Sequence, residues 1–167
     1  MKKYILLFLI SILANSCTVA YKFNGASIDY TKMKTVSIAD FPIKAPLVYA
    51  PLSQTFTEGL RDMFQRQTRL RLIKQGGDLQ FEGEISGYDL TPQAVKENAF
   101  ASETRLTVRV RVKFTNNADP KQSFDQSFTA FRDFSSAQTL VQVQDQLIKA
   151  IVEELTDNIY NASVANW

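Results

Sequence analysis

Apolar and polar residues alternate between Ser102 and Phe134, and this alternation is the strongest structural signal in the chain. The apolar set is Leu106, Val108, Val110, Val112 and Phe114, and the intervening set is Arg105, Thr107, Arg109, Arg111 and Lys113. A period of two indicates a β-strand with one buried face and one exposed face. Residues 116–120 are rich in turn formers, and residues 123–134 alternate again, which predicts a long antiparallel hairpin.

Two other stretches have the spacing of helices with one apolar stripe. The first stripe, within residues 52–67, is Leu52, Phe56, Leu60, Met63 and Phe64; the second is Leu140, Val143, Leu147, Ile151, Leu155 and Ile159, widened by Ile148 and Val152. Thr55 with Glu58, and Ser135 with Gln138, fit capping boxes for these helices. Gly59 is unfavourable inside a helix, so we expect another backbone or side chain to approach it closely.

Shorter strands are predicted at residues 35–41, 70–72 and 79–90. In the last of these the alternation places Phe81, Gly83, Ile85 and Gly87 on one face and Glu82, Glu84, Ser86 and Tyr88 on the other. Residues 91–101 show no clear period and are predicted to form a mobile loop. The order β-α-β-β-β-β-α predicts an α+β two-layer sandwich, in which a mostly antiparallel sheet of about four or five strands is covered on one face by two helices.

Composition fits one domain and excludes several kinds of chemistry. The chain has 167 residues and a net charge of +2. This charge comes from Lys2 and Lys3, because the 17 basic residues that follow them are balanced by 17 acidic residues. A nucleic-acid partner is therefore not expected, since such domains carry a basic excess. With no histidine and one cysteine, the chain holds no Ser-His-Asp triad, no histidine-based zinc site and no internal disulfide, and we expect no cofactor.

The N-terminus has the pattern of a secretory signal, with Lys2 and Lys3 before an apolar run from Tyr4 to Leu13. Residues 13–17, Leu-Ala-Asn-Ser-Cys, resemble the lipobox of bacterial lipoproteins. That resemblance implies a cleaved signal at 1–16 and lipidation of Cys17, followed by an anchor and extended leader at 17–34 and the domain at 35–167. Thr18 after the cysteine points to the outer membrane, with the domain facing the periplasm. The alternative is an ordinary signal peptide that leaves a free thiol.

Several segments together resemble the LptE family of lipopolysaccharide-assembly lipoproteins. They are residues 21–28 (YKFNGASI), 68–70 (TRL), 76–79 (GGDL), 105–108 (RLTV), 113–117 (KFTNN) and 161–167 (NASVANW). The resemblance implies a similar sandwich fold and a non-enzymatic partner of the large outer-membrane β-barrel LptD. It also implies a role in placing lipopolysaccharide in the outer leaflet.

The cationic strand face, Arg105, Arg109, Arg111 and Lys113, is the candidate lipopolysaccharide contact, because guanidinium groups bind phosphate through paired, charge-assisted hydrogen bonds. The alternative is a solvated face whose charges pair with acidic neighbours, for which Glu82, Glu84 and Asp125 are available. Phe124, Phe128, Phe131 and Phe134 are interpreted as core rather than a lipid groove, although a bulge near 130–132 could expose one. Trp167 is expected to pack against the sheet or a partner.

Two other functions stay open. One is an adaptor or folding aid for an outer-membrane protein, with no ligand. The other is an enzyme that uses Glu82 and Glu84, although cross-strand pairing explains these two carboxylates better.

Overall fold

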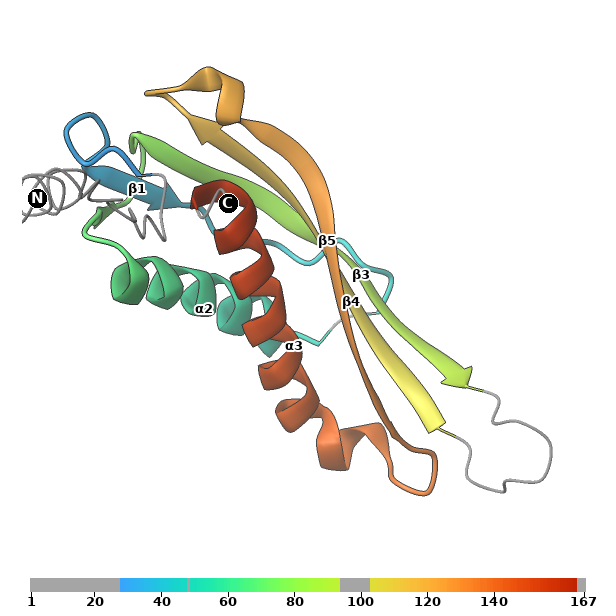
Figure 1. The fold of residues 1–167 in the computed structure, drawn as a ribbon. Helices are drawn as coiled ribbons and strands as arrows, with labels where there is room; N and C mark the ends of the chain where they lie inside the picture. The colour runs from blue at the N-terminus through green and yellow to red at the C-terminus, as the bar shows by residue number, and fades with distance from the viewer. Residues whose placement is uncertain (1–27, 48, 94–102, 165–167) are drawn as a thin grey trace, which may run out of the picture.

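The computed structural model describes residues 28–47, 49–93 and 103–164. These residues form a five-stranded sheet with two helices on one face (Figure 1), which confirms the predicted α+β two-layer sandwich. The strands are β1 (Thr35–Ile38), β2 (Arg71–Ile73), β3 (Leu79–Gln93), β4 (Glu103–Asn116) and β5 (Phe124–Ser135). The helices are α2 (Pro51–Gln67), α3 (Leu140–Val164) and a short 3-10 turn, η1 (Pro120–Gln122).

The sheet has the order β2-β1-β3-β4-β5 and contains two kinds of pairing. Strands β3, β4 and β5 are long and antiparallel, whereas β1 pairs in parallel with both β2 and β3. Helix α2 is the crossover between β1 and β2, as parallel pairing requires. Residues 74–78 then pass from β2 to β3 across β1, on the face opposite the helices, where Gly77 N–H donates to the Ser37 hydroxyl.

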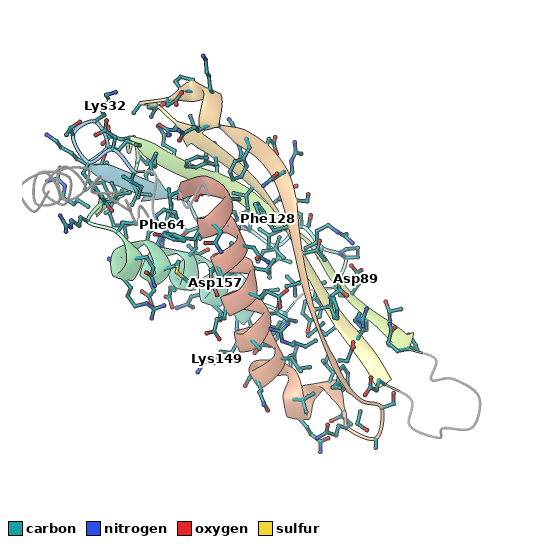
Figure 2. The ribbon with its side chains drawn as sticks, in the orientation of Figure 1. Lys32, Phe64, Asp89, Phe128, Lys149 and Asp157 are labelled. Atoms are coloured by element: carbon teal, nitrogen blue, oxygen red, sulfur yellow. The ribbon has the colours of Figure 1, made fainter. Side chains whose placement is uncertain are left out.

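The core lies between the helices and the sheet. All five apolar residues of the β4 alternation, from Leu106 to Phe114, are buried, and the buried stripes of α2 and α3 pack against them. A Cβ on Gly59 would stand 3.0 Å from Val152 Cγ1, so α3 approaches α2 at this point and the expectation for Gly59 is confirmed. Phe64, labelled in Figure 2, sits in this layer with its ring 4.8 Å from that of Phe81.

The predicted faces of β3 are wrong beyond Ile85. The pairing of β3 with β4 shifts between Ile85 and Gly87, so Ser86 is an extra residue in the strand. Such a bulge moves every later side chain to the opposite face. Tyr88 therefore enters the core, with 3% of its surface exposed, and Gly87 faces outward beside Arg109.

Both predicted capping boxes are also wrong. Helix α2 begins at Pro51, so Thr55 lies inside it and donates to the carbonyl of Pro51. Helix α3 begins at Leu140, and the reciprocal contact there is made by the Gln142 side chain, which accepts the backbone N–H of Thr139. This one contact of a capping box lies four residues later in the chain than the spacing suggested.

The predicted loop at 91–101 is shorter than expected, because Thr91, Pro92 and Gln93 continue β3 and pair with β4. The rest of that loop lies outside the described residues, as do the predicted signal segment at 1–16, the first part of the leader, Cys17 and Trp167.

Candidate functional site

The four predicted cationic residues lie together on the exposed face of β4, opposite the helices. This strand is central among the three long strands, so each outward side chain has one neighbour on β3 and one on β5. We refer to the outward side chains of β3, β4 and β5 as the outer sheet face. Asp89, labelled in Figure 2, belongs to it and stands across from Thr107.

Three of the four cations are paired with carboxylates. Arg105 donates through Nε and Nη2 to Asp133 at 2.7 and 2.8 Å, and Arg111 donates in the same forked way to Asp125 at 2.9 Å for both bonds. Lys113 Nζ lies 3.7 Å from Glu82. Hydrogen bonds from Arg111 and Arg105 lower the pKa of Asp125 and of Asp133 from the ordinary value. The outer sheet face is thus largely neutralised, as the solvated-face alternative predicted.

Arg109 differs from the other three, because it forms no ion pair or side-chain hydrogen bond with any described residue. Its strand neighbours are Gly87 on β3, which has no side chain, and Thr129 on β5. The guanidinium lies over Gly87, with Nη1 3.0 Å from the position of a Cβ there. Among the four predicted cations of β4, Arg109 is therefore the one available to an anionic ligand.

The interpretation of Phe131 as a core residue is wrong, because its side chain lies exposed on the outer sheet face. Phe131 is 44% exposed, and the Arg105 guanidinium carbon lies 3.8 Å from the centre of its ring. The predicted bulge near 130–132 is absent, since the β4–β5 register is continuous, and simple alternation turns Phe131 outward. Phe124, Phe128 and Phe134 face the helices and pack against the core, as expected. Strict alternation from the inward-facing Phe128 is enough to predict that Phe131 and Asp133 face outward.

The carboxylates considered for catalysis lie on β3. Glu82 pairs with Lys113 directly across the strands, and Glu84 stands opposite Arg111. Cross-strand pairing thus accounts for Glu82, and no group of three or more potential metal ligands occurs in the part of the chain that the structure describes.

In the same described ranges, neither α2 nor α3 combines the length and apolar character that a membrane crossing demands.

The fold resembles several solved structures at low sequence identity. A minor lipoprotein from Acinetobacter baumannii matches with a TM-score of 0.52 and 16% identity, over 77% of this chain and 91% of that one. The protein CT253 from Chlamydia trachomatis matches with a TM-score of 0.50 and 11% identity, over 80% and 99% of the two chains. At these identities the likeness concerns the fold alone. A search of curated proteins finds no significant match.

The family comparison is more specific than the fold. The profile of the LptE family, described as lipopolysaccharide-assembly, matches residues 33–163, which include all five strands and nearly all of α3. The chain therefore belongs to the LptE family of lipopolysaccharide-assembly proteins.

Proposed function

We propose that this chain is the lipoprotein subunit of an outer-membrane lipopolysaccharide translocon. In this role it partners an LptD-type β-barrel, assists the assembly of that barrel and helps insert lipopolysaccharide into the outer leaflet. The observation that carries the proposal is the family match over residues 33–163. The LptE family is a family of non-enzymatic outer-membrane lipoproteins, so we propose an action by binding rather than by catalysis.

We further propose that Cys17 holds the protein to the outer membrane on its periplasmic side. Cys17 is the single cysteine of the chain, and the first described residue, Ile28, follows it by 11 positions. Two or more acyl chains make a stable anchor, whereas one chain holds a protein only marginally. Mass spectrometry of the mature N-terminus tests this step, and an unmodified thiol there contradicts it.

The structure supports fewer lipopolysaccharide-binding residues than the four that the sequence predicted. Arg105, Arg111 and Lys113 already have carboxylate partners, so a phosphate at any of them must compete with an existing ion pair. Arg109 has no such competitor in contact. We therefore centre the proposed lipopolysaccharide contact on Arg109.

One observation favours a second candidate, an adaptor or folding aid without a ligand. The ion pairs of the outer sheet face leave little surplus positive charge, and a protein interface can be as polar as ordinary surface.

Purification from outer membranes separates the two candidates. We expect the tagged full-length chain to bring down an LptD-type barrel together with lipopolysaccharide, and its depletion to reduce both mature barrel and surface lipopolysaccharide. Recovery of the barrel without lipopolysaccharide, from wild type and from Arg109→Ala alike, supports the adaptor. Recovery of no integral membrane protein contradicts both candidates.

A further inference from the structure

The outer sheet face presents one large exposed aromatic ring among polar side chains. Phe131 is 44% exposed, whereas the other phenylalanines of β5 pack against the core. Phe131 lies within the regular strand β5, and a ring on a strand keeps its position without a loop to support it.

The Phe131 ring is also held in place from the side. Arg105 covers one face at 3.8 Å, and Arg105 is itself fixed by its forked hydrogen bonds to Asp133. A guanidinium that both stacks on a ring and bonds a carboxylate has little freedom left. The ring is thus preorganised, and its exposed surface is available to a ligand.

The side chains around this ring carry both donors and acceptors. In the strand register Thr107 stands directly opposite Phe131, and Thr129 and Asp133 precede and follow it on the same face of β5. Arg105 and Arg109 lie on either side of Thr107 on β4. Hydroxyl, carboxylate and guanidinium groups therefore surround a flat apolar surface.

We propose that this cluster binds a phosphorylated hexose, with the sugar ring stacked on Phe131 and the phosphate bound by Arg109 and the Thr129 hydroxyl. Residues two apart on a strand are about 7 Å apart, a span that one sugar ring and its phosphate bridge. The proposal rests on the proposed function, because it names which part of a lipopolysaccharide meets the outer sheet face.

Both halves of such a ligand are needed at this cluster. Glu84 and Asp89 lie on β3 near the Gly87 gap, and Asp89 Oδ2 is 3.1 Å from the position of a Cβ on Gly87. These carboxylates repel a free phosphate ion, so the stacked ring must add to the affinity. A neutral sugar leaves Arg109 without an anionic partner. The cluster therefore favours the phosphosugar over inorganic phosphate and over the neutral sugar.

The test is a titration of the purified full-length chain, in detergent micelles, with three soluble probes followed by NMR. The probes are N-acetylglucosamine 1-phosphate, N-acetylglucosamine and inorganic phosphate. We expect the phosphosugar to bind about tenfold more tightly than either other probe, and Phe131→Ala and Arg109→Ala each to weaken it about five- to tenfold. Arg109→Lys keeps the charge but loses the fork and should fall between Arg109→Ala and wild type.

Matched controls separate this site from general effects. Arg71→Ala removes an exposed cation from the edge strand β2, and Val141→Ala trims a side chain that is 85% exposed on α3; both should bind the phosphosugar as wild type does. Equal weakening by the controls, or equal binding of the three probes, overturns the proposal. Failure of the phosphosugar to bind, while the chain still brings down its barrel and lipopolysaccharide, overturns this site and leaves the proposed function standing.

Discussion

The carboxylate of Asp78 accepts the backbone N–H of Lys34 at 2.8 Å, across 44 residues of sequence. The same oxygen accepts the N–H and the hydroxyl of Thr35 at 2.9 and 2.8 Å, and the Thr35 hydroxyl oxygen accepts the N–H of Asp78 at 3.0 Å. This contact ties the start of β3 to the start of β1, just where residues 74–78 complete their passage over β1.

Replacing Asp78 with Ala should destabilise the fold, because it leaves three donors without their acceptor. Hydrogen bonds to a charged group are worth about 1.5–3 kcal/mol when one partner is lost, and partial exposure moderates the sum, so we expect a loss of about 2 kcal/mol in the free energy of unfolding. Urea unfolding of the purified chain measures it. Asp78→Asn keeps an acceptor oxygen without the charge and should lose less; equal losses for the two variants contradict this account.

Acid should weaken the same contact. The backbone N–H of Lys34 and the hydroxyl of Thr35, which both donate to Asp78, lower the pKa of this carboxylate below its ordinary value. The unfolded state then binds more protons than the folded state between the two pKa values, so the stability that Asp78 adds is fully present above about pH 4 and is lost as pH falls through its folded pKa. The pKa values of Asp125 and Asp133 are also lowered, so their contributions to stability should be lost in acid in the same way.

Melting temperatures measured between neutral pH and pH 2 check this dependence. The difference in melting temperature between wild type and Asp78→Asn should shrink as pH falls below about 4. A difference that stays constant down to the lowest pH shows that the Asp78 charge does not stabilise the fold.

The two glycines before Asp78 have different requirements, which a pair of variants can separate. A Cβ on Gly77 would lie 2.6 Å from the backbone nitrogen of Ser37, whereas Gly76 has open space but a φ of +72°. Gly77→Ala should therefore cost at least about 2 kcal/mol by steric conflict with β1. Gly76→Asn should cost less than about 1 kcal/mol, because Asn tolerates the left-handed region. Calorimetric melting of both variants measures these two costs. A Gly77→Ala variant as stable as wild type would contradict the close packing of residues 74–78 on β1.

Packing between the helices predicts a size limit at Gly59. The Val152 Cγ1 atom would touch a Cβ there at 3.0 Å, and Thr156 Cγ2 would lie 3.7 Å away. Gly59→Ala gains helix propensity while crowding Val152, so we expect a change within about 1 kcal/mol. Gly59→Leu must push α3 away and should cost about 1–3 kcal/mol. Thermal unfolding of both variants tests the limit, and equal melting temperatures would show that the two helices separate freely.

The sequence pattern predicts which faces of the strands and helices are buried, but it does not predict which carboxylate pairs with each outward cation. Alternation from Leu106 to Phe114 and the stripe of α3 each have one dominant period, so the buried face of β4 and of α3 follows from local pattern. Partners of the outward cations depend instead on register across strands. Asp133 reaches Arg105 because the β4–β5 ladder places them opposite each other.

The availability of Arg109 depends on a feature that the sequence pattern did not reveal. Without the bulge at Ser86, a residue with a side chain would face Arg109 across the strands; with it, Gly87 does. A bulge changes the side-chain order without changing composition or hydrophobicity, so alternation alone placed Gly87 and Tyr88 on the wrong faces. The sequence pattern also gave no sign that residues 74–78 cross β1. That crossing follows from the strand order, in which β1 lies between β2 and β3.

Single replacements along β4 should separate ligand binding from surface charge. Arg109 has no ion-pair partner among the described residues, whereas Arg111 is engaged by Asp125. We therefore expect Arg109→Ala to weaken binding of purified lipopolysaccharide by about fivefold to tenfold, and Arg111→Ala to have a smaller effect, with no measurable change in melting temperature for either variant or for the double variant. Asp125→Asn releases Arg111 and also removes a negative charge, so it should strengthen binding. If lipopolysaccharide binds the Arg109→Ala, Arg111→Ala double variant as it binds wild type, the outer sheet face is a solvated surface and the lipid contact lies elsewhere on the chain.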